Sequence, residues 1–208
     1  MRDRPSSRPR DMLVDLRHPS RAVPAVTHVR STGTVACLRL LDAQGLRARY
    51  DANLPAEHRQ TVAEMVSGTW IEAAVALAHF RAVDMLELTP TALHALGTSA
   101  GEGVLRYQTS TLLRMSRELG INPWTVFPYA QRMWDRMCKG GDVTIERVGP
   151  KEVLTTLHHG HAQLATSAYF RTMIRGTFHA GLLLWCTRGY VTEVPSPPTT
   201  LVFREAWA

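Results

Sequence analysis

The chain has 208 residues, of which 45% are hydrophobic, with a formal net charge of +6 and three cysteines. This length suits a single domain that folds by burial of apolar side chains, without disulfides or a structural metal. The longest apolar run, AAVALA at residues 73–78, is far shorter than the roughly 20 residues of a membrane span, and the N-terminus lacks a signal-peptide core. We therefore expect a soluble, cytoplasmic protein.

The positive charge is concentrated at the N-terminus, where residues 1–30 carry seven arginines against three aspartates. The remainder is close to neutral, which argues against a nucleic-acid-binding face. Residues 1–25 are rich in Arg, Pro and Ser, so we expect a disordered basic tail that is dispensable for folding. Nucleic-acid or partner contact through that tail stays open. Residues 26–208 are expected to form one ligand-sensing or interaction domain.

Helical patterns dominate the first 140 residues. A helix is expected over Thr34–Gln44 and stops at Gly45, and a second begins after Asn53 and ends at Gly68. Thr69 and Glu72 have the spacing of a capping box, which predicts a central helix over residues 70–80. A short helix begins at Thr89-Pro90 and ends at Gly97.

The segment 97–103, GTSAGEG, is expected to be a glycine-rich loop that joins two helices. A phosphate-binding role would need a GK[ST] ending or a preceding strand, and the sequence provides neither. The next helix ends near Leu119-Gly120, and Asn122-Pro123 begins another whose apolar stripe reaches Cys138. Gly140-Gly141 ends that helix.

The pattern then changes to short alternating segments, which predict strands at residues 143–148 and 151–158 around a Gly149-Pro150 turn. A long helix is expected from Ser167 to Cys186, followed by strands at 189–194 and 200–207. We predict an α+β fold, in which an N-terminal helical half packs on a C-terminal antiparallel four-stranded sheet with a long helix, in the order ββ-α-ββ. Glycine is costly in mid-helix, so a neighbouring backbone is expected to press against Gly176.

Few residues are candidates for a site. Arg171, Arg175 and His179 recur at four-residue spacing on one side of the long helix and could hold an acidic group of a ligand or partner, although a solvated polar face is the favoured explanation. His158, His159 and His161 lack further ligands nearby, so no metal is predicted. The three cysteines are interpreted as buried apolar residues of helices in a reducing compartment. No catalytic residue and no cofactor is predicted.

The stretches at residues 120–152 and 169–186, with the final strand ending in Trp207, resemble a family of uncharacterised bacterial proteins abundant in myxobacteria. The strand-strand-helix-strand-strand ending of that family is similar to the fold of haem-dependent nitric-oxide sensors, vinyl-reductase-like domains and Golgi-transport tethering subunits. The resemblance implies a signalling or docking module. The haem members carry a Tyr-x-Ser-x-Arg motif that holds the haem propionates, and this sequence has no such motif.

We therefore expect a non-enzymatic sensory or docking module, with a protein partner or a second copy of the chain as its binding partner. A small apolar ligand would bind between the helical half and the sheet. Two alternatives remain open. One is a haem-based gas sensor, with His79 or His94 as an axial ligand. The other is an enzyme with an unrecognised site.

Overall fold

The computed structural model describes residues 24–109, 122–158, 162–198 and 200–208. The expected disordered tail lies outside the described residues except for Pro24 and Ala25, and so do His159, His161 and the helix end near Leu119. The boundaries of the tail and of the single domain at 26–208 remain predictions.

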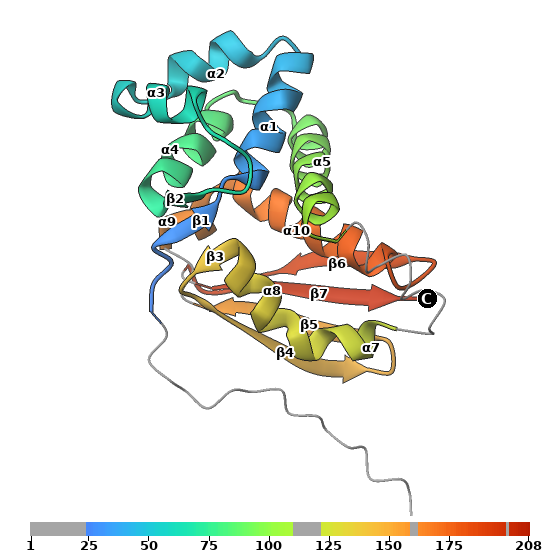
Figure 1. The fold of residues 1–208 in the computed structure, drawn as a ribbon. Coiled ribbons are helices and arrows are strands. Elements are labelled where there is room, and N and C mark those ends of the chain that lie inside the picture. Colours follow the sequence, from blue (N-terminus) through green and yellow to red (C-terminus); the bar gives the residue numbers. More distant parts are fainter. Residues whose placement is uncertain (1–23, 110–121, 159–161, 199) are drawn as a thin grey trace, which may run out of the picture.

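The helical half consists of short elements that lead to one long helix (Figure 1). In chain order these are β1 (His28–Arg30), α1 (Thr32–Ala43), α2 (Arg47–Asn53), α3 (Ala56–Ala63), β2 (Trp70–Glu72), α4 (Ala73–Asp84) and α5 (Pro90–Thr109). The sheet half follows as α7 (Pro123–Val126), a 3-10 turn η1 (Phe127–Tyr129), α8 (Ala130–Met137), β3 (Cys138–Lys139), β4 (Asp142–Gly149), β5 (Glu152–His158), α9 (Ala162–Thr166), α10 (Ala168–Leu183), β6 (Gly189–Val194) and β7 (Leu201–Trp207).

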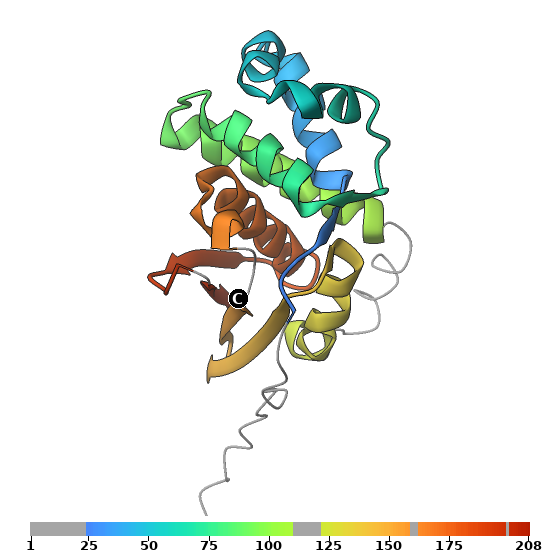
Figure 2. The ribbon, with the colours of Figure 1, turned by 90° about the vertical axis from the view of Figure 1, so that its left-hand side faces the viewer.

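The predicted α+β class and the antiparallel four-stranded sheet are confirmed, with strand order β4-β5-β7-β6. One face of this sheet is buried because α10 packs on β6 and β7 while α8 packs on β4, as Figure 2 shows. The ring centroids of Phe178 on α10 and Phe203 on β7 are 5.4 Å apart. At the end of β7, the ring centroids of Trp207 and Trp124 are 5.0 Å apart, so these two tryptophans, which are distant in sequence, pack against each other.

Glu205 is a carboxylic acid on this buried face. Its side chain accepts a short hydrogen bond from Thr155 Oγ1 on β5, and the residue is 4% exposed. Burial disfavours the charged form and raises the pKa of Glu205 to about 7, against the lowering effect of the Thr155 hydrogen bond.

A second sheet, of three short strands in the order β2-β1-β3, joins the two halves. Central β1 pairs with β2 of the helical half and with β3, which follows α8. The expected capping box at Thr69–Glu72 is wrong, because Trp70–Glu72 is extended and α4 begins at Ala73 without a side-chain cap. Cys138 is likewise in a strand and not in a helix. Pairing with β1, which is distant in sequence, overrides the local helix signals at both places.

The predicted glycine-rich loop at 97–103 is also wrong, because α5 runs through it as one helix. Gly97 and Gly101 of this segment face α10, while Gly103 faces Ala36 of α1. A Cβ on Gly101 would lie 2.5 Å from the backbone nitrogen of Thr177, and a Cβ on Gly176 would lie 2.5 Å from the Cα of Thr98. The predicted backbone contact at Gly176 is therefore confirmed, and its partner is α5.

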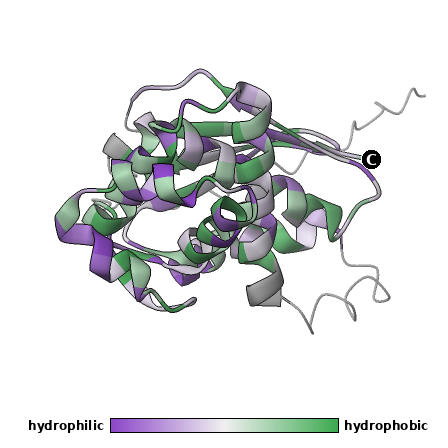
Figure 3. Ribbon diagram, turned by 90° about the horizontal axis from the view of Figure 1, so that it is seen from above, coloured by the Kyte–Doolittle hydropathy of each residue, from purple (hydrophilic) through white to green (hydrophobic). Residues whose placement is uncertain are grey.

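Hydrophobic and hydrophilic residues are mixed around the helices when the molecule is seen from above (Figure 3). Within the described ranges, none of the helices combines the length and hydrophobicity that crossing a bilayer requires.

The α5–α10 contact predicts opposite effects of two glycine substitutions in the same helix. Gly176→Ala places a methyl group against the Thr98 backbone and is expected to lower the free energy of unfolding by about 1–3 kcal/mol. A Cβ on Gly181 would meet only Leu105 Cδ1, at 4.0 Å. Gly181→Ala should therefore raise the free energy of unfolding by up to about 1 kcal/mol, because alanine has the higher helix propensity. Urea unfolding measures both. A Gly176→Ala variant as stable as wild type would contradict the contact.

The buried carboxyl predicts a pH dependence. Because the pKa of Glu205 is raised from 4.5 to about 7 on folding, its contribution to stability is fully present below pH 4.5 and is lost as the pH rises through 7. Glu205→Gln should therefore stabilise the protein at pH 8 by up to about 3 kcal/mol and have little effect at pH 4. Chemical unfolding of both proteins at the two pH values tests this. An equal effect at both pH values would show that the carboxyl is not buried as described.

Candidate functional site

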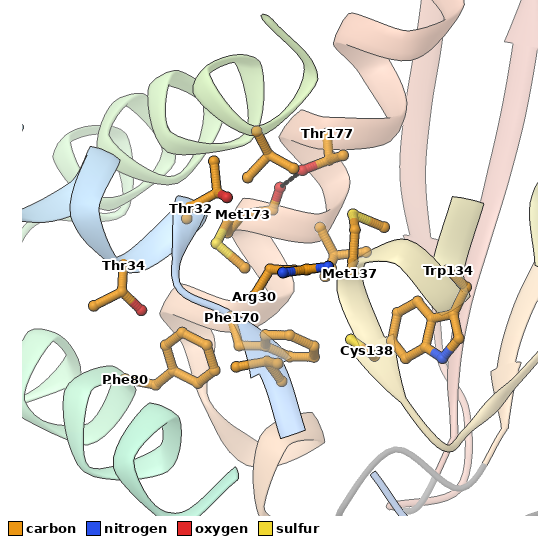
Figure 4. Close-up of a pocket in the computed structure, with 14 residues that line it drawn as sticks. Arg30, Thr32, Thr34, Phe80, Trp134, Met137, Cys138, Phe170, Met173 and Thr177 are labelled. Carbon is orange, nitrogen blue, oxygen red and sulfur yellow. Dashed lines mark hydrogen bonds between the residues drawn. The ribbon is translucent and has the colours of Figure 1, made fainter. Parts of the chain in front are cut away.

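The candidate site is an apolar cavity of about 40 Å³ at the junction of the two halves, shown in Figure 4. Its walls come from β1, α1, α4 and α5 on one side and from α8, β3 and α10 on the other. The lining residues are Val29, Arg30, Thr32, Gly33, Thr34, Phe80, Val104, Trp134, Met137, Cys138, Phe170, Met173, Ile174 and Thr177. A ligand here would therefore touch both halves at once.

Aromatic rings and thioethers provide most of the wall. The rings of Phe80 and Phe170 lie with centroids 5.2 Å apart, and the side chains of Met137 and Met173 lie beside them (Figure 4). The Thr177 hydroxyl donates to the carbonyl of Met173 at 2.9 Å, within its own helix. A cavity with such walls offers water few partners, and cavities of this kind stay dry and accept apolar guests.

Arg30 is the one charged residue of the lining, and its hydrogen bonds hold the wall together. Its Nη1 donates to the carbonyl of Gly68 at 2.6 Å and its Nε to that of Arg136 at 3.3 Å. The guanidinium also lies 4.0 Å from the centroid of the Trp70 ring. These contacts tie β1 to the segment before β2 and to the end of α8, so Arg30 positions elements and is not free to bind an anion in the cavity.

A buried group of polar rings lies behind the two phenylalanines. The hydroxyl of Tyr50 is 2.8 Å from Nδ1 of His79, while His79 Nε2 and the hydroxyl of Tyr169 have no hydrogen-bond partner of good geometry. Burial lowers the pKa of His79 to about 3, with a smaller contribution from Arg47. Burial also raises the pKa of the Cys37 thiol, which lies near Tyr169, to about 12. The imidazole and the thiol are therefore both neutral at pH 7.

The residues expected to bind a ligand or partner lie outside this cavity. Arg171 forms an ion pair with Glu193 of β6, with Nε and Oε1 2.9 Å apart. Arg175 contacts His94 of α5, and His179 lies one turn further along α10. Of the three residues that share this helix face, Arg171 is therefore paired with β6, while Arg175 and His179 lie apart from that pair, with His94 of α5 beside Arg175. Their binding role stays a prediction.

No pattern in the sequence indicates the cavity itself. Phe80, Met137 and Met173 occur at positions that helical periodicity marks as core, and periodicity does not separate a filled core from one with a void. The expected location, between the helical half and the sheet half, agrees with the position of the cavity.

Solved structures show the same fold. A structure from work titled "Probing the function of heme distortion in the H-NOX family" matches with a TM-score of 0.52 and 11% identity, over 86% of this chain and 94% of that one. A mutant H-NOX protein from K. algicida in the Fe(II) unliganded state matches with the same score and identity, over 86% and 96%. A structure titled "Modulating Heme Redox Potential Through Protein-Induced Porphyrin Distortion" has a TM-score of 0.51 and 11% identity, over 86% and 99%.

The chain therefore has the fold of the H-NOX proteins. No family model matches the sequence, and no curated protein matches it either. At 11% identity the likeness concerns the fold and does not extend to the ligand.

The residues that line this cavity do not fit a haem. Sites for ligands of that size have volumes of about 300–1,000 Å³, whereas this cavity has about 40 Å³. No histidine is among its lining residues, and burial raises the pKa of the Cys138 thiol and so disfavours a thiolate ligand. His79 offers an unpartnered Nε2, but the rings of Phe80 and Tyr169 pack against it with centroids 5.5 and 5.7 Å away.

Proposed function

We propose that this chain is a non-catalytic sensory module that binds a small apolar molecule in the cavity between its halves and signals occupancy by a change in their packing. The observation that carries the proposal is the composition of the wall, which is almost entirely apolar and is shared between both halves. The volume of about 40 Å³ limits the guest to a few heavy atoms, the size of a diatomic gas or a xenon atom.

Two features of the wall suit a switch. Thioether side chains adapt to a guest by rotation, and one methionine comes from each side of the junction, Met137 from α8 and Met173 from α10. Occupancy would be communicated through α10, because this helix lines the cavity and also packs on β6 and β7. A ligand shifts such an equilibrium only if it binds one packing better than the other.

Xenon binding, detected by xenon NMR or in crystals under xenon pressure, tests the cavity. We expect a single site in contact with Met173. Gly33→Ala is the cavity-filling variant, because a Cβ there would lie 3.0 Å from Met173 Sδ and 3.5 Å from Val104 Cγ2. It should abolish the signal, while Gly181→Ala, whose Cβ meets only Leu105 Cδ1 at 4.0 Å, should retain it. Xenon binding unchanged by Gly33→Ala, or no binding to wild type, would refute the proposal.

A haem-based gas sensor is the second candidate. The titles of the structural neighbours name haem, so the comparisons favour this candidate over a haem-free sensor. The small volume of the cavity and the absence of histidine from its wall oppose it. Expression with a haem precursor separates the two, because a stoichiometric Soret band in the purified protein would establish the haem sensor and overturn the haem-free proposal. If that band were lost in His79→Leu, the axial ligand would also be identified.

A further inference from the structure

A group of basic side chains lies on the outer surface where α5 meets α10. We call His94, Arg175 and His179 the seam basic cluster. The guanidinium of Arg175 contacts Nδ1 of His94, and the Thr98 hydroxyl is 3.4 Å from the same nitrogen. A guanidinium only donates hydrogen bonds, so His94 Nδ1 must accept and its imidazole is neutral in this arrangement.

The charge of the cluster is not balanced by any carboxylate of the described residues. Within the described part of the chain, no carboxylate forms an ion pair with any of its three members. One turn earlier on α10, Arg171 is by contrast paired with Glu193 at 2.9 Å. The pKa of His94 is lowered, first by partial burial and then by the positive charges of Arg175 and His179. Protonation of His94 is therefore disfavoured beside Arg175 and His179, and a bound anion would offset that repulsion.

The cluster is held on a rigid support. Gly97, Gly101 and Gly176 bring the two helix backbones into contact beside it, so His94 on one helix keeps its position relative to Arg175 on the other. A donor set that is already in place loses little conformational entropy on binding. His94 is exposed and the other two are half-buried, and none of the three lines the cavity between the halves, so an occupant must approach from outside.

We propose that the seam basic cluster is a docking site for a carboxylate on an acidic segment of a partner protein. The planar guanidinium suits a carboxylate, and the imidazole of His94 would become a second donor by taking up a proton. This inference extends the proposed function, because the inner side of α10 lines the cavity with Met173 and Thr177 while its outer side carries two cluster residues. Docking can be measured without any cavity ligand, so the two proposals fail independently.

The test is a titration of the full chain with a hexaglutamate peptide at pH 6 and pH 8, followed by NMR of the histidine side chains. We expect saturable shifts of the His94 and His179 signals, a rise in the pKa of His94 on binding, and affinity at least about tenfold weaker at pH 8. Arg175→Gln should weaken binding by about tenfold or more, while Arg39→Gln, which removes one exposed arginine of α1, should change it by less than about twofold.

Equal losses in the two variants would mean unspecific attraction to a basic protein and would overturn the proposal, as would an absence of saturable shifts. A thermal melt of Arg175→Gln that matches wild type establishes that lost binding is not lost folding. Titration with inorganic phosphate forms a second arm, and tighter binding of phosphate than of the peptide would reject a carboxylate docking site in favour of a phosphate site.

Discussion

Helices α5 and α10 approach each other more closely than side chains would allow, because glycine occurs on both sides of their contact. Gly97 and Gly101 on α5 face α10, and Gly176 on α10 faces the backbone of Thr98. Glycine in mid-helix lowers stability by up to about 1 kcal/mol relative to alanine, and close packing along both helices offsets this cost. The contact fastens the helical half to the helix that also covers the sheet.

The other features depend on this contact. With α10 fixed against α5, the space between the halves closes around Phe80, Phe170 and Met173 and leaves a cavity that admits only a small guest. Strand β1 also joins the two halves, because it pairs with β2 of the helical half and with β3 of the sheet half. The fold is that of the H-NOX proteins, but fold and ligand are separate matters. We propose that the residues at this junction accommodate a small apolar guest and not a macrocycle.

The sequence predicts the sheet half well, because its signals are local. Asn122 caps its helix by accepting a hydrogen bond from the Trp124 backbone, as expected from Asn122-Pro123. The Gly149-Pro150 turn and the alternation around it predict two paired strands, which are present. Tertiary contacts decide where prediction fails. The glycines at 97–103 are typical of a loop in isolation, but they form a helix surface because another backbone lies against them.

The candidate site was the least predictable part. Arg171 and Arg175 share a helix face, and only the fold reveals that one meets Glu193 and the other His94. Neither partner is a neighbour in sequence. The cavity is a small volume left between apolar side chains of both halves, and residue pattern carries no measure of such a volume.

Native-state hydrogen exchange tests the central claim, that the α5–α10 contact makes the two halves one cooperative unit. Slowly exchanging amides of α5, α10, β5 and β7 should all report the same free energy of opening, close to that of global unfolding. In the Gly176→Ala variant, the free energies of opening of all four elements should fall by the same amount. If the amides of α1, α4 and α5 opened at a much lower free energy while the sheet stayed protected, the two halves would unfold independently. The claim that the α5–α10 contact makes them one cooperative unit would then be wrong.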